Sequence, residues 1–153
     1  MKAVIMAGGE GRRLRAVSKG SPKPMVELLG RPILEHIVLL LKKEGFDEIC
    51  MSLKYKAEEI ERYFRDGGDF GVKISYRVEP EPLGTAGGVK NCADFYGDEP
   101  FLVISGDAVC DFRLSSLMER HRAEDCAVTL ALQRHPSPLS YGLTVTDGEG
   151  LGL

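Results

Sequence analysis

The chain has 153 residues, of which 43% are hydrophobic and 28% charged, a composition typical of one soluble globular domain. Its formal net charge of −3 argues against general nucleic-acid binding, which favours a strongly basic surface. No stretch approaches the roughly 20 consecutive apolar residues that span a membrane, and the four cysteines form no C-x-x-C pair. These features predict a cytoplasmic protein with neither nucleic-acid nor membrane partners.

Short apolar runs alternate with segments of helical period, which is the pattern of an α/β domain with a mostly parallel sheet. Residues 2–6 predict the first strand. Apolar side chains then recur at helical spacing over residues 33–41, and residues 48–52 predict the second strand. A second helix around residues 58–65 and a strand over residues 72–78 follow.

The second half of the chain continues the alternation. Residues 101–104 form an unalternating apolar run, which predicts a central strand buried on both faces. A helical stripe begins at residue 114, and residues 126–132 predict another strand. A loop over residues 136–140 precedes a final short strand around residues 143–146. We expect helices on both faces of the sheet.

Glycines and cations gather between the first strand and Pro24. Glycine lets backbone N–H groups approach an anion closely, and arginine offers a planar fork of donors that matches phosphate oxygens. The spacing fits neither the P-loop G-x-x-x-x-G-K-[ST] nor the dinucleotide pattern G-x-G-x-x-G. The segment therefore predicts a polyphosphate-binding loop of another kind, with an ordinary strand-to-loop turn as the alternative. Its candidate residues are Gly8, Gly9, Gly11, Arg12, Arg13 and Lys23.

A carboxylate follows the predicted strand over residues 101–104, in the sequence Ser105-Gly106-Asp107. Ligands of open α/β sheets bind at the carboxyl ends of the strands. Because Mg²⁺ is usually held by one or two carboxylates together with substrate phosphates, Asp107 is a candidate Mg²⁺ ligand. Asp111 lies just before a helical stripe and is better explained as its N-cap.

A third segment, residues 79–88, combines prolines that stiffen an extended chain with glycines that let a flat ligand lie against the backbone. The Glu79 carboxylate can accept hydrogen bonds from the N1–H and exocyclic amine of guanine, an arrangement that adenine does not satisfy. Thr85 is placed to cap the helix that follows.

These three ordered segments resemble the nucleoside-diphosphate-sugar pyrophosphorylases, the sugar-1-phosphate nucleotidyltransferases. Residues 7–35 follow the opening signature of that family, residues 81–87 its base-binding segment and residues 105–107 its metal strand. Within the family, the chain is most similar to mannose-1-phosphate guanylyltransferases. The resemblance implies a Rossmann-like three-layer α/β fold, with residues 1–153 as a single, apparently truncated N-terminal part.

The resemblance implies attack of a sugar 1-phosphate on the α-phosphorus of a nucleoside triphosphate, giving a nucleotide sugar and pyrophosphate. Mannose 1-phosphate and GTP are the expected substrates. The implied catalytic residues are Arg13 and Lys23, which would clamp the triphosphate, while Asp107 would hold Mg²⁺. Gly84 would join Glu79 in selecting the base. The full set of candidate nucleotide-binding residues is Gly8, Gly9, Gly11, Arg12, Glu79, Gly84 and Thr85.

The chain also departs from the family pattern. Arg12 stands where threonine is usual, and Ala16-Val17-Ser18 replaces the usual Pro-Leu-Thr. The alternatives are therefore a non-catalytic regulatory or nucleotide-sensing subunit of the same fold, and a glucose-1-phosphate uridylyl- or thymidylyltransferase. Since the family's second metal-binding carboxylate is absent, we expect nucleotide binding with slow turnover or none. A missing C-terminal part would expose a sheet edge and favour a homo-oligomer.

Overall fold

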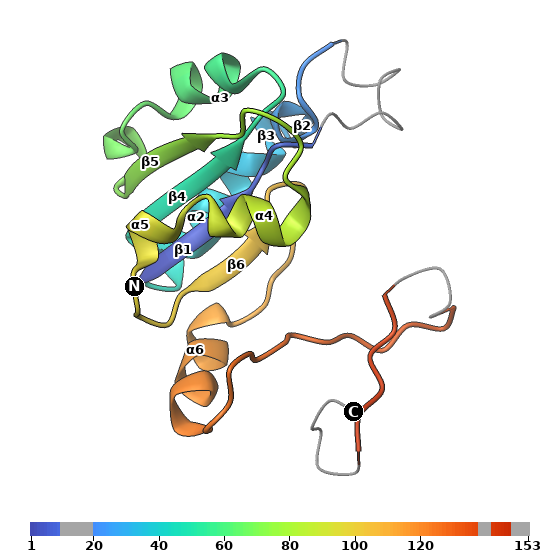
Figure 1. The fold of residues 1–153 in the computed structure, drawn as a ribbon. Coiled ribbons are helices and arrows are strands. Elements are labelled where there is room, and N and C mark those ends of the chain that lie inside the picture. The colour runs from blue at the N-terminus through green and yellow to red at the C-terminus, as the bar shows by residue number, and fades with distance from the viewer. Residues whose placement is uncertain (10–19, 138–141, 148–153) are drawn as a thin grey trace.

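The computed structural model describes residues 1–9, 20–137 and 142–147 (Figure 1). Its centre is a parallel four-stranded sheet in the order β5-β4-β1-β6. The predicted α/β class with a mostly parallel sheet is confirmed. The strands of this sheet are β1 (Lys2–Met6), β4 (Glu48–Leu53), β5 (Lys73–Val78) and β6 (Leu102–Ser105).

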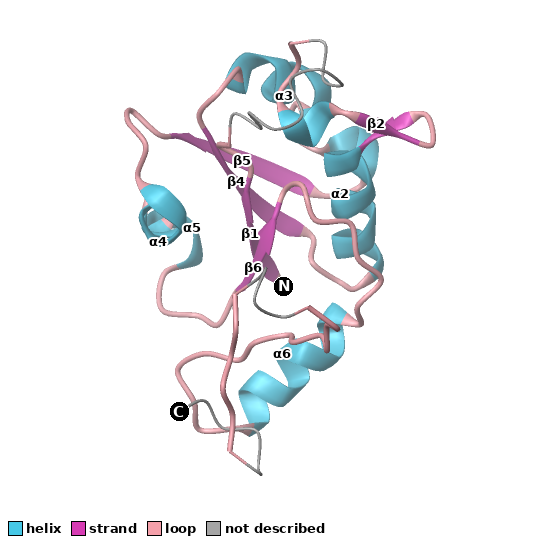
Figure 2. Cartoon of the chain, turned by 90° about the vertical axis from the view of Figure 1, so that its right-hand side faces the viewer, coloured by secondary structure: helices cyan, strands magenta, loops and turns pink. Residues whose placement is uncertain are grey.

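Helices cover both faces of the sheet, as the sequence predicts (Figure 2). The first layer contains α2 (Ile33–Lys43), α3 (Ala57–Phe64) and α6 (Leu114–Ala123), and the second contains α4 (Gly84–Lys90) and α5 (Ala93–Tyr96). Two 3-10 turns, η2 (Lys23–Met25) and η3 (Gly68–Phe70), and a hairpin of β2 (Glu27–Leu28) and β3 (Arg31–Pro32) complete the described elements. No helix in the described ranges is long and apolar enough to cross a membrane.

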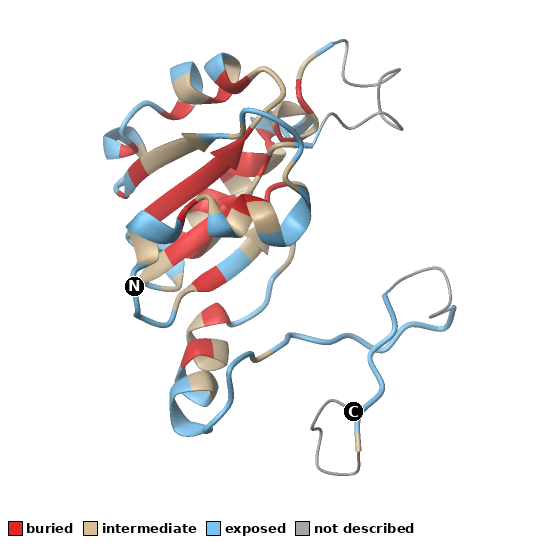
Figure 3. Cartoon of the chain, in the orientation of Figure 1, coloured by how far each residue is buried: buried red, intermediate tan, exposed pale blue. Residues whose placement is uncertain are grey.

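The core is divided by the sheet, because successive side chains of a strand point to opposite faces. Ile5 packs in the larger cluster beneath α2, α3 and α6. Its neighbour Val4 packs with Cys50 and Cys92 in a smaller cluster on the side of α4 and α5. Both faces of β1 are therefore buried (Figure 3), which explains its continuous apolar sequence.

Helix α2 shows how the sequence sets the bounds of an element. Its buried side chains, Leu34, Ile37, Val38 and Leu41, recur at helical spacing and face the core. Gly45 ends the helix with a φ of +82°, where the Phe46 N–H donates to the Leu41 carbonyl at 2.8 Å. This is a Schellman motif, which favours glycine at the left-handed position.

Three strand predictions differ from the structure. Residues 101–104 were expected to form a central strand, but β6 lies at the edge of the sheet and Val103 is 40% exposed. Residues 126–132 and 143–146 do not form strands, and Val128 is 70% exposed. An apolar run indicates β-propensity, whereas a strand also needs a neighbour to pair with.

The predicted helix caps are also wrong. Asp111 does not cap α6, whose N-cap is Arg113. Instead, the carboxylate of Glu44 at the end of α2 accepts hydrogen bonds from the Ser115 N–H at 3.1 Å and from its hydroxyl at 2.7 Å. A carboxylate from a neighbouring helix thus satisfies a donor in the first turn of α6, and the local sequence does not reveal it. Thr85 does not cap α4, because Leu83 is the N-cap and Thr85 is already helical.

Candidate functional site

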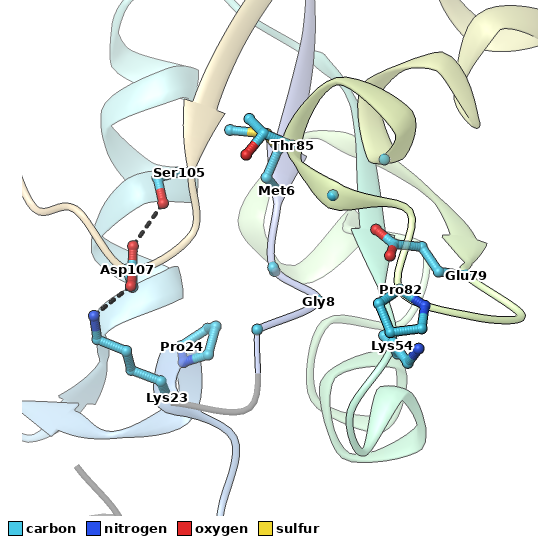
Figure 4. Close-up of a pocket in the computed structure, with 14 residues that line it drawn as sticks. Met6, Gly8, Lys23, Pro24, Lys54, Glu79, Pro82, Thr85, Ser105 and Asp107 are labelled. Atoms are coloured by element: carbon cyan, nitrogen blue, oxygen red, sulfur yellow. Dashed lines mark hydrogen bonds and ion pairs between the residues drawn. The ribbon is translucent and has the colours of Figure 1, made fainter. Parts of the chain in front are cut away.

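The three segments singled out in the sequence meet in one pocket of about 530 Å³ at the carboxyl end of the sheet (Figure 4). This is the edge at which ligands of open α/β folds bind. Of the candidate residues, those that line the pocket are Gly8, Gly9, Lys23, Glu79, Gly84, Thr85 and Asp107. Gly11, Arg12 and Arg13 lie outside the described residues.

An ion pair joins two of the candidates across 84 positions of sequence. The ammonium of Lys23, in η2, donates to Oδ2 of Asp107, which follows β6. The Ser105 hydroxyl donates to the other carboxylate oxygen, Oδ1, at 2.6 Å. Both charged side chains are 32% exposed, so the ion pair is accessible from the pocket. A cation and an anion therefore stand side by side at one end of the cavity.

The Asp107 carboxyl is ionised at neutral pH. Burial raises its pKa, but hydrogen bonds from Lys23 and Ser105 and the Lys23 charge outweigh this, so the pKa lies below its usual range. No cluster of three metal-binding side chains occurs among the described residues. An Asp107 carboxylate thus suits Mg²⁺ only if substrate phosphates supply further oxygen ligands, which is the usual mode for this ion.

Glu79 lies directly after β5, on the side of the pocket opposite the Lys23–Asp107 pair (Figure 4), and its hydrogen bonds hold that side together. Its Oε1 accepts a hydrogen bond from the Ser52 hydroxyl at 2.9 Å, and its Oε2 accepts one from the Leu83 N–H at 3.2 Å. A Cβ at Gly88 would lie only 2.7 Å from Glu79 Oε1, so a side chain at this helical position would displace the carboxylate. Glu79 therefore connects β4, its own loop and α4.

Glycines keep the backbone open along the pocket. Gly84 begins α4 with a φ of +71°, a backbone conformation that residues other than glycine rarely adopt. A Cβ added at this position would lie in open space. At Gly106, an added Cβ would lie 2.9 Å from the Ala7 Cβ. Gly106 thus allows the chain before Asp107 to pass close to the end of β1.

Sequence reasoning missed Lys54, which also lines the pocket. Lys54 is the first residue after β4 and is half-buried. Its place in the sequence indicated this, because Lys54 lies two residues after the strand predicted over residues 48–52, and the ends of parallel strands form the ligand-binding edge of the sheet. Lys54 was overlooked because it belongs to no glycine-rich or proline-rich motif.

Comparisons with known proteins find relatives that match nearly all of this chain. The chain is 40% identical to a UTP–glucose-1-phosphate uridylyltransferase of Synechocystis, covering 98% of this chain and 42% of that protein. It is 38% identical to a D-glycero-alpha-D-manno-heptose 1-phosphate guanylyltransferase of Campylobacter jejuni, covering 99% of this chain and 66% of that protein. The solved structure of HddC from Yersinia pseudotuberculosis with GMP-PN superposes with a TM-score of 0.70 at 37% identity, covering 78% of this chain and 53% of that one.

The chain spans less than half the length of the Synechocystis relative. The similarity nevertheless extends through nearly all of the residues present here, since residues 2–151 match the family described as Nucleotidyl transferase. This match includes all three segments that form the pocket. The chain therefore belongs to the nucleotidyl transferase family.

Proposed function

We propose that this chain forms the nucleotide-binding part of a sugar-1-phosphate nucleotidyltransferase, which converts a sugar 1-phosphate and a nucleoside triphosphate into a nucleotide sugar and pyrophosphate. The observation that carries this proposal is the pocket, which combines a lysine–aspartate pair at one end with a glycine-lined wall at the other. The family membership and the named activities of the relatives support it.

In the proposed reaction, a phosphate oxygen of the sugar 1-phosphate attacks the α-phosphorus of the triphosphate, and the bond to the leaving pyrophosphate breaks. No group of the protein needs to bond to the substrate. The Lys23 ammonium has three N–H donors, so it can keep its contact with Asp107 and also donate to a phosphate oxygen. Arg13, from the glycine-rich segment, would supply a second cation. These groups position the reactants and balance their charge.

Asp107 would hold Mg²⁺, which supplies charge neutralisation for the triphosphate when bound. The low pKa of Asp107 supports this role, because a ligand to a divalent cation has to be deprotonated. Gly8 and Gly9 would bring backbone close to the nucleotide, and Glu79 would hold the loop against which the base lies.

For the substrates, we propose GTP and mannose 1-phosphate. Guanylyltransferases among the relatives support this choice. UTP with glucose 1-phosphate is a second candidate, because the uridylyltransferase of Synechocystis is 40% identical to this chain.

The test is calorimetric titration of GTP, UTP, dTTP and ATP with Mg²⁺ into the chain and into Lys23→Ala. We expect GTP or UTP to bind, and Lys23→Ala to weaken binding by about 10- to 100-fold through loss of a charge-assisted contact. Lys73→Ala is the matched control, because Lys73 is exposed at the amino-terminal end of β5 and lies outside the pocket. Binding of none of the four nucleotides would overturn the proposal.

A further inference from the structure

Lys54 is a charged residue in the pocket for which the proposed mechanism has no role. It forms no ion pair with any described residue. Its stem lies beside the end of the first strand, since a Cβ at Gly8 would be 3.4 Å from the Lys54 Cβ. Lys54 lines the pocket with no ion-pair partner among the described residues, so its ammonium can donate to an acceptor on a ligand.

The position of Lys54 separates it from the other lysine of the pocket. Figure 4 shows Lys54 together with Glu79 and Pro82 on one side of the cavity, and the Lys23–Asp107 pair on the other. If the phosphates and Mg²⁺ occupy the side of the ion pair, the base lies on the side of Lys54.

The chemistry of this wall distinguishes the bases. The Lys54 ammonium can only donate hydrogen bonds, and the Glu79 carboxylate can only accept them. Each Glu79 oxygen already accepts one hydrogen bond from the protein and can accept another. Guanine presents the O6 acceptor beside the N1–H donor, and uracil and thymine present O4 beside N3–H. Adenine presents an amine donor beside the N1 acceptor, which is the reverse. Lys54 facing the exocyclic position and Glu79 facing the ring nitrogen would therefore match the first three bases and mismatch adenine.

We propose that Lys54 is a specificity-determining residue whose ammonium donates a hydrogen bond to the carbonyl oxygen of guanine, uracil or thymine. This inference rests on the proposed function, since it assigns the base of the same nucleotide. Lysine makes the equivalent contact with guanine O6 when proteins read DNA. Glu79 would accept the adjacent ring N–H in addition to its bonds with Ser52 and Leu83.

The experiment compares Lys54→Met, which keeps most of the apolar stem and removes the charge, with Lys54→Arg, which keeps a donor. Titrations use GTP, UTP, ATP and inorganic tripolyphosphate, each with Mg²⁺. We expect Lys54→Met to weaken GTP or UTP binding by about 10- to 100-fold. Affinity for tripolyphosphate is expected to stay within about twofold, and Lys54→Arg is expected to retain most of the preference for GTP or UTP over ATP.

An equal loss for tripolyphosphate and for all nucleotides would overturn the inference, because Lys54 would then contact phosphate. Unchanged affinities in Lys54→Met would also overturn it, while leaving the proposed function intact. Absence of nucleotide binding by the unmodified chain would instead overturn the proposed function, and this inference with it. Lys73→Met, at the opposite end of β5, controls for loss of one positive charge.

Discussion

Adding one methyl group at Gly106 tests the close contact that positions Asp107. The Cβ of Gly106→Ala would lie 2.9 Å from the Ala7 Cβ, 3.1 Å from the Met6 carbonyl oxygen and 3.2 Å from Ile5 Cγ2. The first two atoms are fixed by the backbone, so no rotamer change relieves the clash. The Gly106 N–H also donates to the Met6 oxygen at 2.8 Å. The methyl group therefore has to push the end of β6 away from β1.

The expected loss of stability has two sources, the overpacking and the weakened hydrogen bond. Overpacking costs about 1–3 kcal/mol, and a weakened hydrogen bond adds about 1 kcal/mol. We expect the free energy of unfolding to fall by about 2–4 kcal/mol. A loss of about 3 kcal/mol lowers Tm by roughly 6–12 °C for a chain of this size. Because Asp107 follows directly, affinity for a nucleotide with Mg²⁺ is expected to fall as well.

The assay is urea unfolding followed by far-UV circular dichroism, since the chain has no tryptophan to report by fluorescence. Gly9→Ala is the matched control, because an added Cβ there has no described neighbour within 4 Å. Its free energy of unfolding is expected to stay within about 0.5 kcal/mol of the unmodified chain. A Gly106→Ala protein as stable as Gly9→Ala would refute the reasoning.

Three further predictions concern hydrogen bonds and pH. Ser52 is 1% exposed and donates to Glu79, so Ser52→Ala is expected to reduce stability in urea by about 1–2 kcal/mol; an unchanged midpoint would count against this bond. The Tyr63 hydroxyl donates a hydrogen bond to the carboxylate of Glu35 in α2, and this bond raises the pKa of Tyr63 to about 12. The protonated phenol therefore stabilises the fold fully below pH about 10, and this stabilisation is lost as pH rises to about 12. Tyr63→Phe should show a shallower alkaline decline, and an identical pH profile would contradict the assignment. The lowered pKa of Asp107 contributes stability above pH about 4 that is lost on acidification, so Asp107→Asn should flatten the acid limb of stability against pH, and an equally steep limb would exclude this contribution.

Much of the fold follows from local patterns. The helical spacing over residues 33–41 predicted α2, because its buried face recurs every three to four residues of the local sequence. Gly45 ends the helix two residues later than Lys43, in a left-handed conformation that favours glycine. The position of β6 was not evident. An apolar run of residues 101–104 has the same sequence whether one neighbour or two lie beside it, and only the pairing decides.

The site shows the same division. Each predicted segment follows a predicted strand, so its place at one edge of a parallel sheet was predictable. The partners of its side chains were not. The Lys23–Asp107 pair and the Ser52–Glu79 bond join residues that are distant in sequence, and they depend on strand order. Lys54 stood outside any motif, and only its place after β4 identifies it.

The most direct test of one nucleotide site built from three segments is a ¹H–¹⁵N NMR titration with Mg²⁺ and GTP or UTP, which suits a chain of 16.8 kDa. We expect the largest shift changes on the amides of Gly8, Gly84, Gly88 and Asp107, which come from all three segments and line the pocket. Changes confined to another surface, such as α6 and the exposed edge of β6, would contradict it.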